Sequence, residues 1–207
     1  MKIICIGRNY ADHVRELDHT REVPAAPQFF MKPDTALLRN NDPFYIPSFS
    51  RDLHYETELV VRINRVVKCI DERFAHRCYD EVGLGIDFTA RDLQRECIAK
   101  GLPWEIAKAF DHSAAVSPEF VPLAALGGDI QDLHFEMALS GRTVQRGHTA
   151  DMLFGVDRLI AHVSQFITLK IGDLLFTGTP VGVGPVAPGD RIVASLAGRT
   201  LLDFDIR

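Results

Sequence analysis

Hydrophobic and polar residues alternate most clearly between Asp52 and Ile63, in the segment DLHYETELVVRI. Side chains of a strand repeat every two residues, so this pattern predicts one strand with two distinct faces. Glu56 and Glu58 share the second face, with Cα atoms roughly 6.5–7 Å apart. Two such carboxylates can converge on one cation, or they can be two acids on a solvated strand face. The pattern alone leaves both interpretations open.

Further strands are predicted by short apolar runs. They are the N-terminal run IICIG, the segment EVGLGID, and the late runs DLLFTGTP and DRIVASLAG, each of which starts at a Gly-Asp turn. The segment HFEMALSGRTVQR predicts a hairpin that turns at Ser140-Gly141.

Three segments have the spacing of helices. NYADHVREL predicts a short helix with Asn9 as its N-cap. TARDLQRECIAK predicts a second helix, started by a variant capping box of Thr89 and Asp92 and stopped at Gly101. VDRLIAHVSQFI carries an apolar face and predicts a third.

The order of these elements indicates the fold class. Strands outnumber helices and do not alternate with them regularly, and five prolines between residues 24 and 50 predict extended chain and turns. This pattern favours a mixed α+β or β-rich fold over a doubly wound sheet. The length of 207 residues suits one large domain or two small ones.

Composition narrows the class of protein. A net charge of -5 gives no basic footprint for nucleic acid, and no apolar run is long enough to span a bilayer. The N-terminus becomes polar too early for a signal peptide. Four cysteines without C-x-x-C spacing predict free thiols in a reducing compartment, either the cytoplasm or an organelle matrix.

Several polar residues are candidates for chemistry. Asp87 ends a predicted strand and offers a third carboxylate, although an acid there is often only a turn former. Arg91 and Gln94 are spaced i, i+3, so they share a helix face that either binds an oxyanion or is solvated.

A second set of candidate residues also allows both a functional and a structural interpretation. His13 and Glu16 are also i, i+3 and form either a base dyad or a surface pair. Lys108 lies among apolar residues, where a lysine either snorkels to solvent or faces an anion. The loop around Thr179 offers backbone N–H groups to a carboxylate, or it is a plain turn.

Taken together, these segments resemble a known family. GRNYADHVRE, FFMKPDTAL, HYETELVV, GIDFTARDLQ, WEIAKAFD and LLFTGTPVGVGP are similar, in this order, to motifs of the fumarylacetoacetate hydrolase family. The resemblance runs from Ile4 to about Gly189, and the E-x-E pair followed by D-x-T-A-R-D-x-Q is its most specific part. The chain looks like the short form of the family, most similar to the acylpyruvate hydrolase and oxaloacetate decarboxylase group.

This resemblance implies an architecture. The expected fold is a β-rich α+β roll of mixed sheets, of the family's C-terminal-domain type, with a few flanking helices. Residues 1–207 are expected to form a single catalytic domain, commonly assembled as a homodimer in the cytoplasm, without nucleic acid or membrane partners.

The resemblance also implies the site. It assigns Mg²⁺ or Mn²⁺ to Glu56, Glu58 and Asp87, an all-oxygen set that suits hard cations. His13 and Glu16 are implied as the dyad that activates water, with Lys108 as the third catalytic residue. The residues implied to bind substrate are Arg8, Arg91, Gln94 and Thr179.

The implied activity is metal-dependent cleavage of a C–C bond in a small 2-oxo acid through an enolate that the cation stabilises. Acylpyruvate hydrolysis and oxaloacetate decarboxylation are the main expectations. Alternatives are an oxaloacetate keto–enol tautomerase, an isomerase, decarboxylase or hydratase of 2-oxo diacids from aromatic degradation, and a non-catalytic metal-binding protein.

The chain departs from the family's motifs at three positions. Asp34 follows the KP pair where many relatives have a small hydroxyl residue, and Ser140 and His148 replace asparagines of the hairpin motif. Gln145 of that motif is kept. These departures bear on the rim of the site and on substrate size rather than on the metal.

Overall fold

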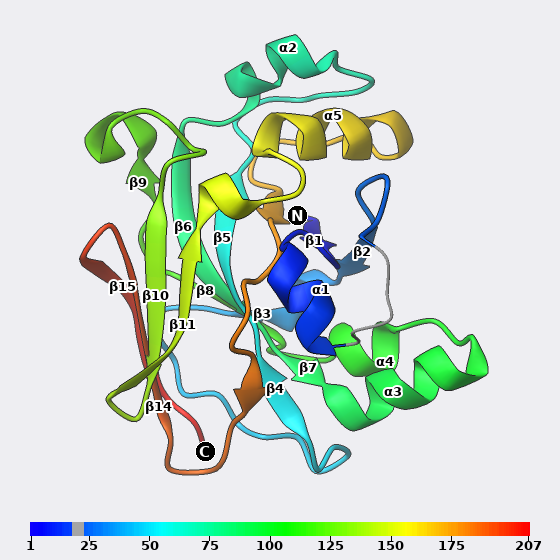
Figure 1. Cartoon of the computed structure of the whole chain (residues 1–207), viewed down its shortest axis with the longest axis vertical. Coiled ribbons are helices and arrows are strands. Elements are labelled where there is room, and N and C mark those ends of the chain that lie inside the picture. Colours follow the sequence, from blue (N-terminus) through cyan, green and yellow to red (C-terminus); the bar gives the residue numbers. More distant parts are fainter. Residues whose placement is uncertain (18–22) are drawn as a thin grey trace.

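A mixed eight-stranded sheet forms the centre of the computed structural model, which describes residues 1–17 and 23–207 (Figure 1). Its strands follow the order β2-β1-β12-β5-β6-β8-β3, and β9 pairs with β6. β1 is parallel to β12 and β3 to β8, whereas the other neighbours are antiparallel. The bounds are β1 Ile3–Ile6, β2 Phe29–Lys32, β3 Leu37–Leu38, β5 Thr57–Arg62, β6 Glu81–Asp87, β8 Ala114–Val116, β9 Val121–Pro122 and β12 Leu174–Phe176.

Two smaller sheets complete the β-structure. One has the order β11-β10-β14-β15, and the other β13-β4-β7. The predicted hairpin is confirmed, because β10 and β11 are joined by Ser140 and Gly141, both with positive φ. The bounds are β4 Leu53–Tyr55, β7 Thr89–Ala90, β10 His134–Leu139, β11 Arg142–His148, β13 Gly184–Pro185, β14 Arg191–Leu196 and β15 Arg199–Asp205.

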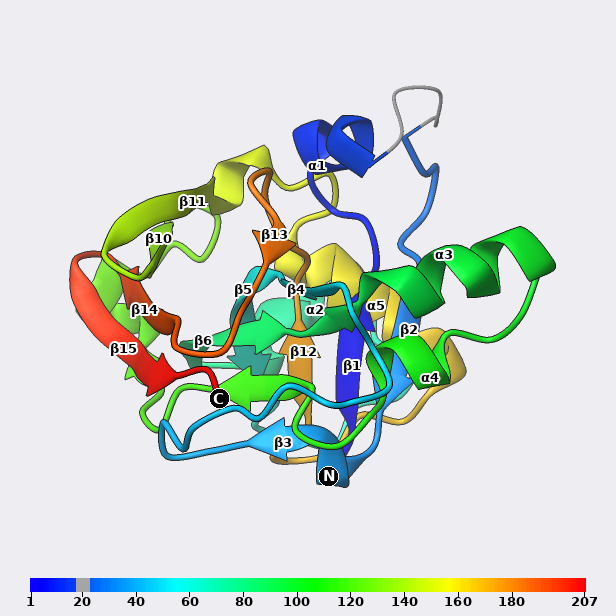
Figure 2. The ribbon, with the colours of Figure 1, turned by 90° about the horizontal axis from the view of Figure 1, so that it is seen from below.

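The helices are short and flank the sheets. Figures 1 and 2 show α3 and α4 on the side of the molecule away from the four-stranded sheet. In the part of the chain that the structure describes, no helix is long and apolar enough to cross a membrane. The bounds are α1 Ala11–Leu17, α2 Glu72–Ala75, α3 Arg91–Lys100, α4 Glu105–Lys108 and α5 Val156–Phe166, with short 3-10 helices at Asp34–Ala36, His76–Cys78, Leu123–Leu126 and Thr149–Asp151.

The main core lies where the large sheet packs on the four-stranded sheet. Leu59 and Leu84 of the large sheet and Met137 of β10 are fully buried in one cluster. Phe44 and Phe88 stack in the same cluster with ring centroids 3.9 Å apart. Burial of large apolar side chains between two sheets is the main stabilising term of such folds. The β-rich α+β fold with mixed sheets is therefore confirmed.

The prediction of one continuous strand from Asp52 to Ile63 is wrong. The chain leaves one sheet at Tyr55 and enters another at Thr57, with Glu56 between them. The carbonyl of Glu56 accepts a hydrogen bond from the Asp87 N–H at 2.8 Å, so the break lies against the end of β6. Period-2 patterns cannot reveal such a change of partner, because both strands keep the alternation.

The two predicted helix caps are also wrong. Helix α1 begins at Ala11, and the Asn9 side chain instead bonds the backbones of Phe154 and Thr177. Helix α3 begins at Arg91 without a side-chain cap, and the Thr89 hydroxyl donates to the Asp87 carbonyl. Long-range partners replace capping at Asn9, whereas the Thr89 hydroxyl bonds the carbonyl two residues before it and accepts from Lys108.

Candidate active site

Three carboxylates meet where the large sheet adjoins the three-stranded sheet. Glu56 lies between β4 and β5, Glu58 is on β5, and Asp87 is the last residue of β6. One carboxylate oxygen from each lies within 4.8 Å of the other two, and all three residues are buried. Glu58 pairs with Gly85 in the β5–β6 ladder, so Asp87 and Glu56 come together just beyond it.

Lys108 carries its ammonium group into this cluster. It is the last residue of α4 and is 3% exposed. Its Nζ donates to Glu56 Oε2 at 2.8 Å, to Asp87 Oδ2 at 2.9 Å and to the Thr89 hydroxyl at 2.6 Å. Burial lowers the pKa of Lys108, but the charges of Asp87 and Glu56 outweigh it, and the net shift is upward. The side chain is therefore a protonated donor and does not snorkel.

Arg91 and Gln94 extend the site along α3. Arg91 Nη2 donates to Glu56 Oε1 at 2.5 Å, and its Nη1 donates to Gln94 Oε1 at 2.7 Å. Both residues are buried, so the i, i+3 pair does not form a solvated helix face. Arg91 Nε is also buried and has no hydrogen-bond partner among the described residues.

Lys32 is a buried cation that the sequence did not suggest as part of the site. Its Nζ lies 2.7 Å from Asp87 Oδ1 as an ion pair, while its hydrogen bonds go to the carbonyls of Ser113 and Phe88. Asp87 Oδ1 thus has no hydrogen-bond donor within the described part of the chain. A lysine at the end of a Phe-rich strand, in the segment FFMKP, was the available sign of this role.

The carboxylates differ in their charge. Burial raises the pKa of Glu56, but Lys108 and Arg91 lower it by more, so the group stays ionised. Burial and the charges of Asp87 and Glu56 raise the pKa of Glu58 well above its usual range. Without a cation, Glu58 therefore favours its protonated, uncharged form.

These residues fit a hard divalent cation. The donor set consists only of carboxylate oxygens, which Mg²⁺ and Mn²⁺ prefer. The raised pKa of Glu58 disfavours its ionised form, and Asp87 Oδ1 has the Lys32 ammonium 2.7 Å away but outside hydrogen-bond geometry. A cation would stabilise both groups.

His13 and Glu16 meet on the first helix. His13 Nδ1 lies 3.1 Å from Glu16 Oε2, and His13 is 2% exposed. Glu16 Oε1 accepts a hydrogen bond from the Gly182 N–H at 2.9 Å. Burial raises the pKa of Glu16, but the bonds from His13 and Gly182 outweigh it, and the net shift is downward. An ionised Glu16 thus orients His13.

The loop at residues 177–180 is bound to the protein interior. The Thr179 hydroxyl donates to the Thr57 carbonyl and accepts from Gln145 Nε2, both at 2.9 Å. Gln145 also accepts from the Thr57 N–H and donates to the Pro180 carbonyl. The structure therefore does not place the Thr179 hydroxyl where a substrate could bind it.

A cavity of about 420 Å³ brings the other predicted residues together. Glu58, Asp87 and Thr179 do not line it, and the first two connect to it through their neighbours Glu56 and Lys108. Residues that the sequence did not suggest also form its wall, including His54, Arg95 and Trp104. The predicted residues that line it are Arg8, His13, Glu16, Glu56, Arg91, Gln94 and Lys108.

Comparison with known proteins gives consistent matches over the whole chain. The family model described as fumarylacetoacetate (FAA) hydrolase C-terminal matches residues 2–206. The oxaloacetate tautomerase YcgM of Escherichia coli (strain K12) is 40% identical over 200 residues, which are 97% of this chain and 90% of that protein. The mitochondrial oxaloacetate decarboxylase of Dictyostelium discoideum is 39% identical over 207 residues, 99% of this chain and 93% of that protein.

A solved structure agrees with these matches. The fumarylpyruvate hydrolase of Pseudomonas aeruginosa, in complex with Mn²⁺ and pyruvate, superposes with a TM-score of 0.91 at 34% identity, covering 100% of this chain and 89% of that one. All three relatives are enzymes by name. The chain belongs to the fumarylacetoacetate hydrolase family, as its motifs predicted.

Proposed function

We propose that this protein is a metal-dependent enzyme that interconverts the keto and enol forms of oxaloacetate. The observation that carries the proposal is the cavity that Arg8, Arg91 and Lys108 line together with the His13–Glu16 dyad, beside a buried carboxylate cluster. The relative from Escherichia coli, named as an oxaloacetate tautomerase, supports this choice among the reactions open to the family.

The charges of the cavity support a small substrate with two carboxylates. Arg8 and Arg91 supply positive charge on its wall, and Arg91 Nε has no hydrogen-bond partner among the described residues. Arginine binds carboxylates in fixed, often bidentate geometry. We assign one substrate carboxylate to Arg91 with Gln94 and the other to Arg8. The backbone N–H groups of the Thr179 loop, rather than the Thr179 hydroxyl, are a further candidate for binding a substrate carboxylate.

His13 serves as the base in this proposal. Its Nδ1 is held by Glu16, which leaves Nε2 to take a proton from the carbon beside the 2-oxo group. Lys108 stays protonated, and its positive charge lies beside the cavity in which negative charge develops on the substrate. Mg²⁺ or Mn²⁺ held by Glu56, Glu58 and Asp87 would supply a Lewis acid at the same oxygen.

Cleavage of a C–C bond is the second candidate, and the His13–Glu16 hydrogen bond favours it. A base at 3.1 Å from its orienting carboxylate can activate water for acylpyruvate hydrolysis as well as remove a proton. Oxaloacetate decarboxylation needs no water and shares the enolate. The relatives from Pseudomonas aeruginosa and Dictyostelium discoideum support this candidate by their names.

A substrate panel with purified protein tests the two candidates. Enol oxaloacetate in Mg²⁺ buffer should lose its ultraviolet absorbance much faster with the protein than without it. Pyruvate release from oxaloacetate and loss of acetylpyruvate are measured in parallel, with Glu56→Gln as the inactive control. Consumption of acetylpyruvate without faster enol decay would replace the first candidate by the second. No turnover of any substrate would contradict both.

We further infer that residues 1–207 act as one catalytic domain in a homodimer, in a reducing compartment such as the cytoplasm. The cysteines Cys5, Cys69, Cys78 and Cys97 are all free, which supports the reducing compartment. Light scattering on the purified protein measures the mass of the assembly, and a monomeric mass would contradict the dimer.

A further inference from the structure

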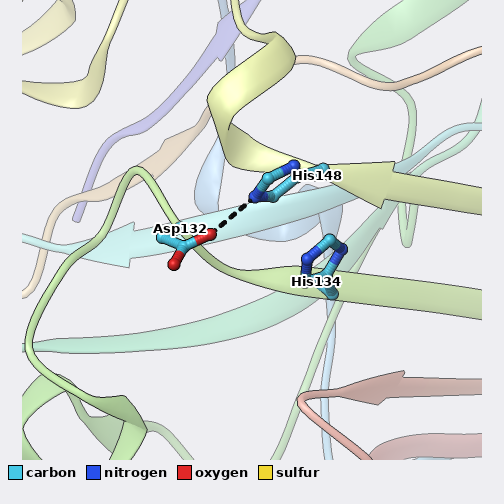
Figure 3. A group of neighbouring side chains, drawn as sticks. All are labelled: Asp132, His134 and His148. Carbon is cyan, nitrogen blue, oxygen red and sulfur yellow. Dashed lines mark hydrogen bonds and ion pairs between the residues drawn. The ribbon is translucent and has the colours of Figure 1, made fainter.

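A second group of metal-ligating side chains lies at the open end of the β10–β11 hairpin. Asp132, His134 and His148 each offer one ligand atom, and the three atoms lie within 4.8 Å of one another. Figure 3 shows His134 on β10, His148 at the end of β11 and Asp132 on the chain just before β10. None of the three is among the residues that line the active-site cavity.

The two imidazole rings lie side by side. His134 and His148 are paired across the hairpin, and their rings stack with centroids 3.9 Å apart and an interplanar angle of 17°. His148 Nε2 lies 2.9 Å from Asp132 Oδ1. Ligand atoms of a tetrahedral ion lie roughly 3.3–3.6 Å apart, as bond lengths of about 2.0–2.2 Å require. Ring nitrogen lone pairs lie in the ring plane, so the stacked imidazoles must turn about their side-chain bonds to bring the three atoms onto one ion.

The backbone beside each ligand is fixed before any ion binds. Leu133 and Thr149 exchange hydrogen bonds, with the Leu133 N–H donating to the Thr149 hydroxyl at 2.9 Å and the Thr149 N–H donating to the Leu133 carbonyl at 3.0 Å. The carbonyl of His134 accepts from the Ala197 N–H at 2.8 Å. Only side chains need to be ordered on binding, which keeps the entropic cost low.

We propose that Asp132, His134 and His148 form a second metal site, for Zn²⁺ or a similar transition-metal ion. Two imidazole nitrogens and one carboxylate oxygen suit Zn²⁺, Ni²⁺ and Cu²⁺, whereas Mg²⁺ prefers oxygen alone. Asp132 and His134 are exposed, so water completes the coordination. The two sites of the chain thus differ in the ions they select.

The bound ion would cross-link the loop before β10 to the end of β11. His148 occupies one of the positions at which the chain departs from its family's hairpin motif, and the catalytic proposal gives it no role. The second site therefore depends on side chains separate from those proposed for catalysis, and the two can be tested independently.

Calorimetric titration with Zn²⁺ in saturating Mg²⁺ tests the second site. The wild type should bind one Zn²⁺ per chain, and His134→Ala or His148→Ala should weaken binding by at least about tenfold. His76→Ala is the matched control, because His76 is an exposed histidine on a short 3-10 helix elsewhere. Unchanged affinity in both hairpin variants, or an equal loss in the control, would overturn the proposal.

Cu²⁺ provides a readout that identifies the ligands. Electron paramagnetic resonance of the Cu²⁺-loaded wild type should show coupling to two nitrogens, and each His→Ala variant should show one. A spectrum from oxygen ligands alone would assign the ion to the carboxylates and contradict the second site. Metal-free melting of each variant checks the fold, and turnover with Mg²⁺ should match the wild type.

Discussion

Lys108 combines full burial with a retained charge, and this makes it the most informative single residue of the site. Its three hydrogen bonds go to Glu56, Asp87 and Thr89, which come from two segments of the chain. A protonated amine so placed stabilises an oxyanion in the cavity, and it also balances the carboxylates when no cation is bound. The two roles can be separated by substitution.

We expect Lys108→Met to lower kcat/KM for oxaloacetate by about 10²–10³-fold, since it removes a buried positive charge beside the developing negative charge. Stabilisation by Mg²⁺ should persist, because Glu56 and Asp87 lose a competitor for their oxygens and keep their charge. Enzyme kinetics and thermal melting with Mg²⁺ measure both effects. Lys100→Met, at an exposed lysine of α3, is the control. Wild-type kinetics in the Lys108 variant would contradict its role.

Glu16→Ala separates three reactions that each pass through an enolate. Without the carboxylate, His13 loses its orientation, so acylpyruvate hydrolysis and tautomerisation should fall by about 10²–10⁴-fold. Decarboxylation of oxaloacetate should fall much less, because it needs neither activated water nor removal of a proton from carbon. The comparison uses kcat/KM for each substrate, with Asp12→Ala on the same helix as control. An equal loss in all three reactions would show that Glu16 serves a shared step.

At the scale of secondary-structure elements, the sequence predicted those whose pattern is local. The strand of β6, the hairpin turning at Ser140 and the apolar face of α5 were all predicted from a few adjacent residues. The break at Glu56 and the parallel pairing of β1 with β12 depend on partners more than 25 residues away along the chain. Periodicity carries no information on such partners, so these features could not be predicted.

The difference between local patterns and distant partners also explains which residues of the site could be predicted. Glu56 and Glu58 were noticed because two acids interrupt a strand pattern, and the family resemblance assigned them to a metal. They meet Asp87 because the chain changes sheets at Glu56. Lys32 was missed because its partner Asp87 is distant in sequence, and a lysine after two phenylalanines also fits a strand edge. Asn9 was taken for a cap because its distant carbonyl partners cannot be seen in the sequence.

Asp92 ties helix α3 to the chain before β4, and this contact should depend on pH. Its carboxylate accepts from the Ser50 hydroxyl at 2.7 Å and from the Arg51 N–H at 2.9 Å. Burial raises the pKa of Asp92, but these hydrogen bonds outweigh it, so the pKa lies below the usual 3.8. A lowered pKa means that the stabilisation is present above pH 3.8 and is lost as the pH falls through the lowered value.

We therefore expect Asp92→Ala to lower the free energy of unfolding by about 1 kcal/mol at neutral pH, a modest figure because the contact is partly exposed. The difference from the wild type should shrink as the pH falls below the usual pKa. Urea unfolding at a series of pH values measures it, with Asp111→Ala at an exposed turn as control. A difference that grows toward acid pH would contradict this assignment.

At the scale of the whole molecule, the candidate site joins parts of the chain that have no local reason to meet. The carboxylates come from the boundary of two sheets, Lys108 from α4 and the dyad from α1. A cation held by the three carboxylates would link β5 and β6 of the large sheet to Glu56, which joins β5 to β4 of the three-stranded sheet. Ion binding should therefore stabilise the entire fold rather than one loop.

We expect Mg²⁺ to raise the melting temperature of the protein in a single cooperative transition. A ligand at about 100 times its Kd adds about 2.7 kcal/mol to the free energy of unfolding, and for a chain of this size that corresponds to about 5–10 °C. Scanning calorimetry with Mg²⁺ and with a chelator measures the shift. Two separate transitions would contradict the single domain.

Glu58→Gln makes this test specific for the carboxylate site. Because the pKa of Glu58 is raised, the metal-free protein favours the protonated acid, which glutamine imitates in shape and charge. The variant should thus melt close to the metal-free wild type, yet gain no stability from Mg²⁺ and lose its activity with oxaloacetate. Glu72→Gln, at an exposed position of α2, should keep the full shift. If Glu58→Gln responds to Mg²⁺ as the wild type does, the ion binds elsewhere and the three carboxylates are not its ligands.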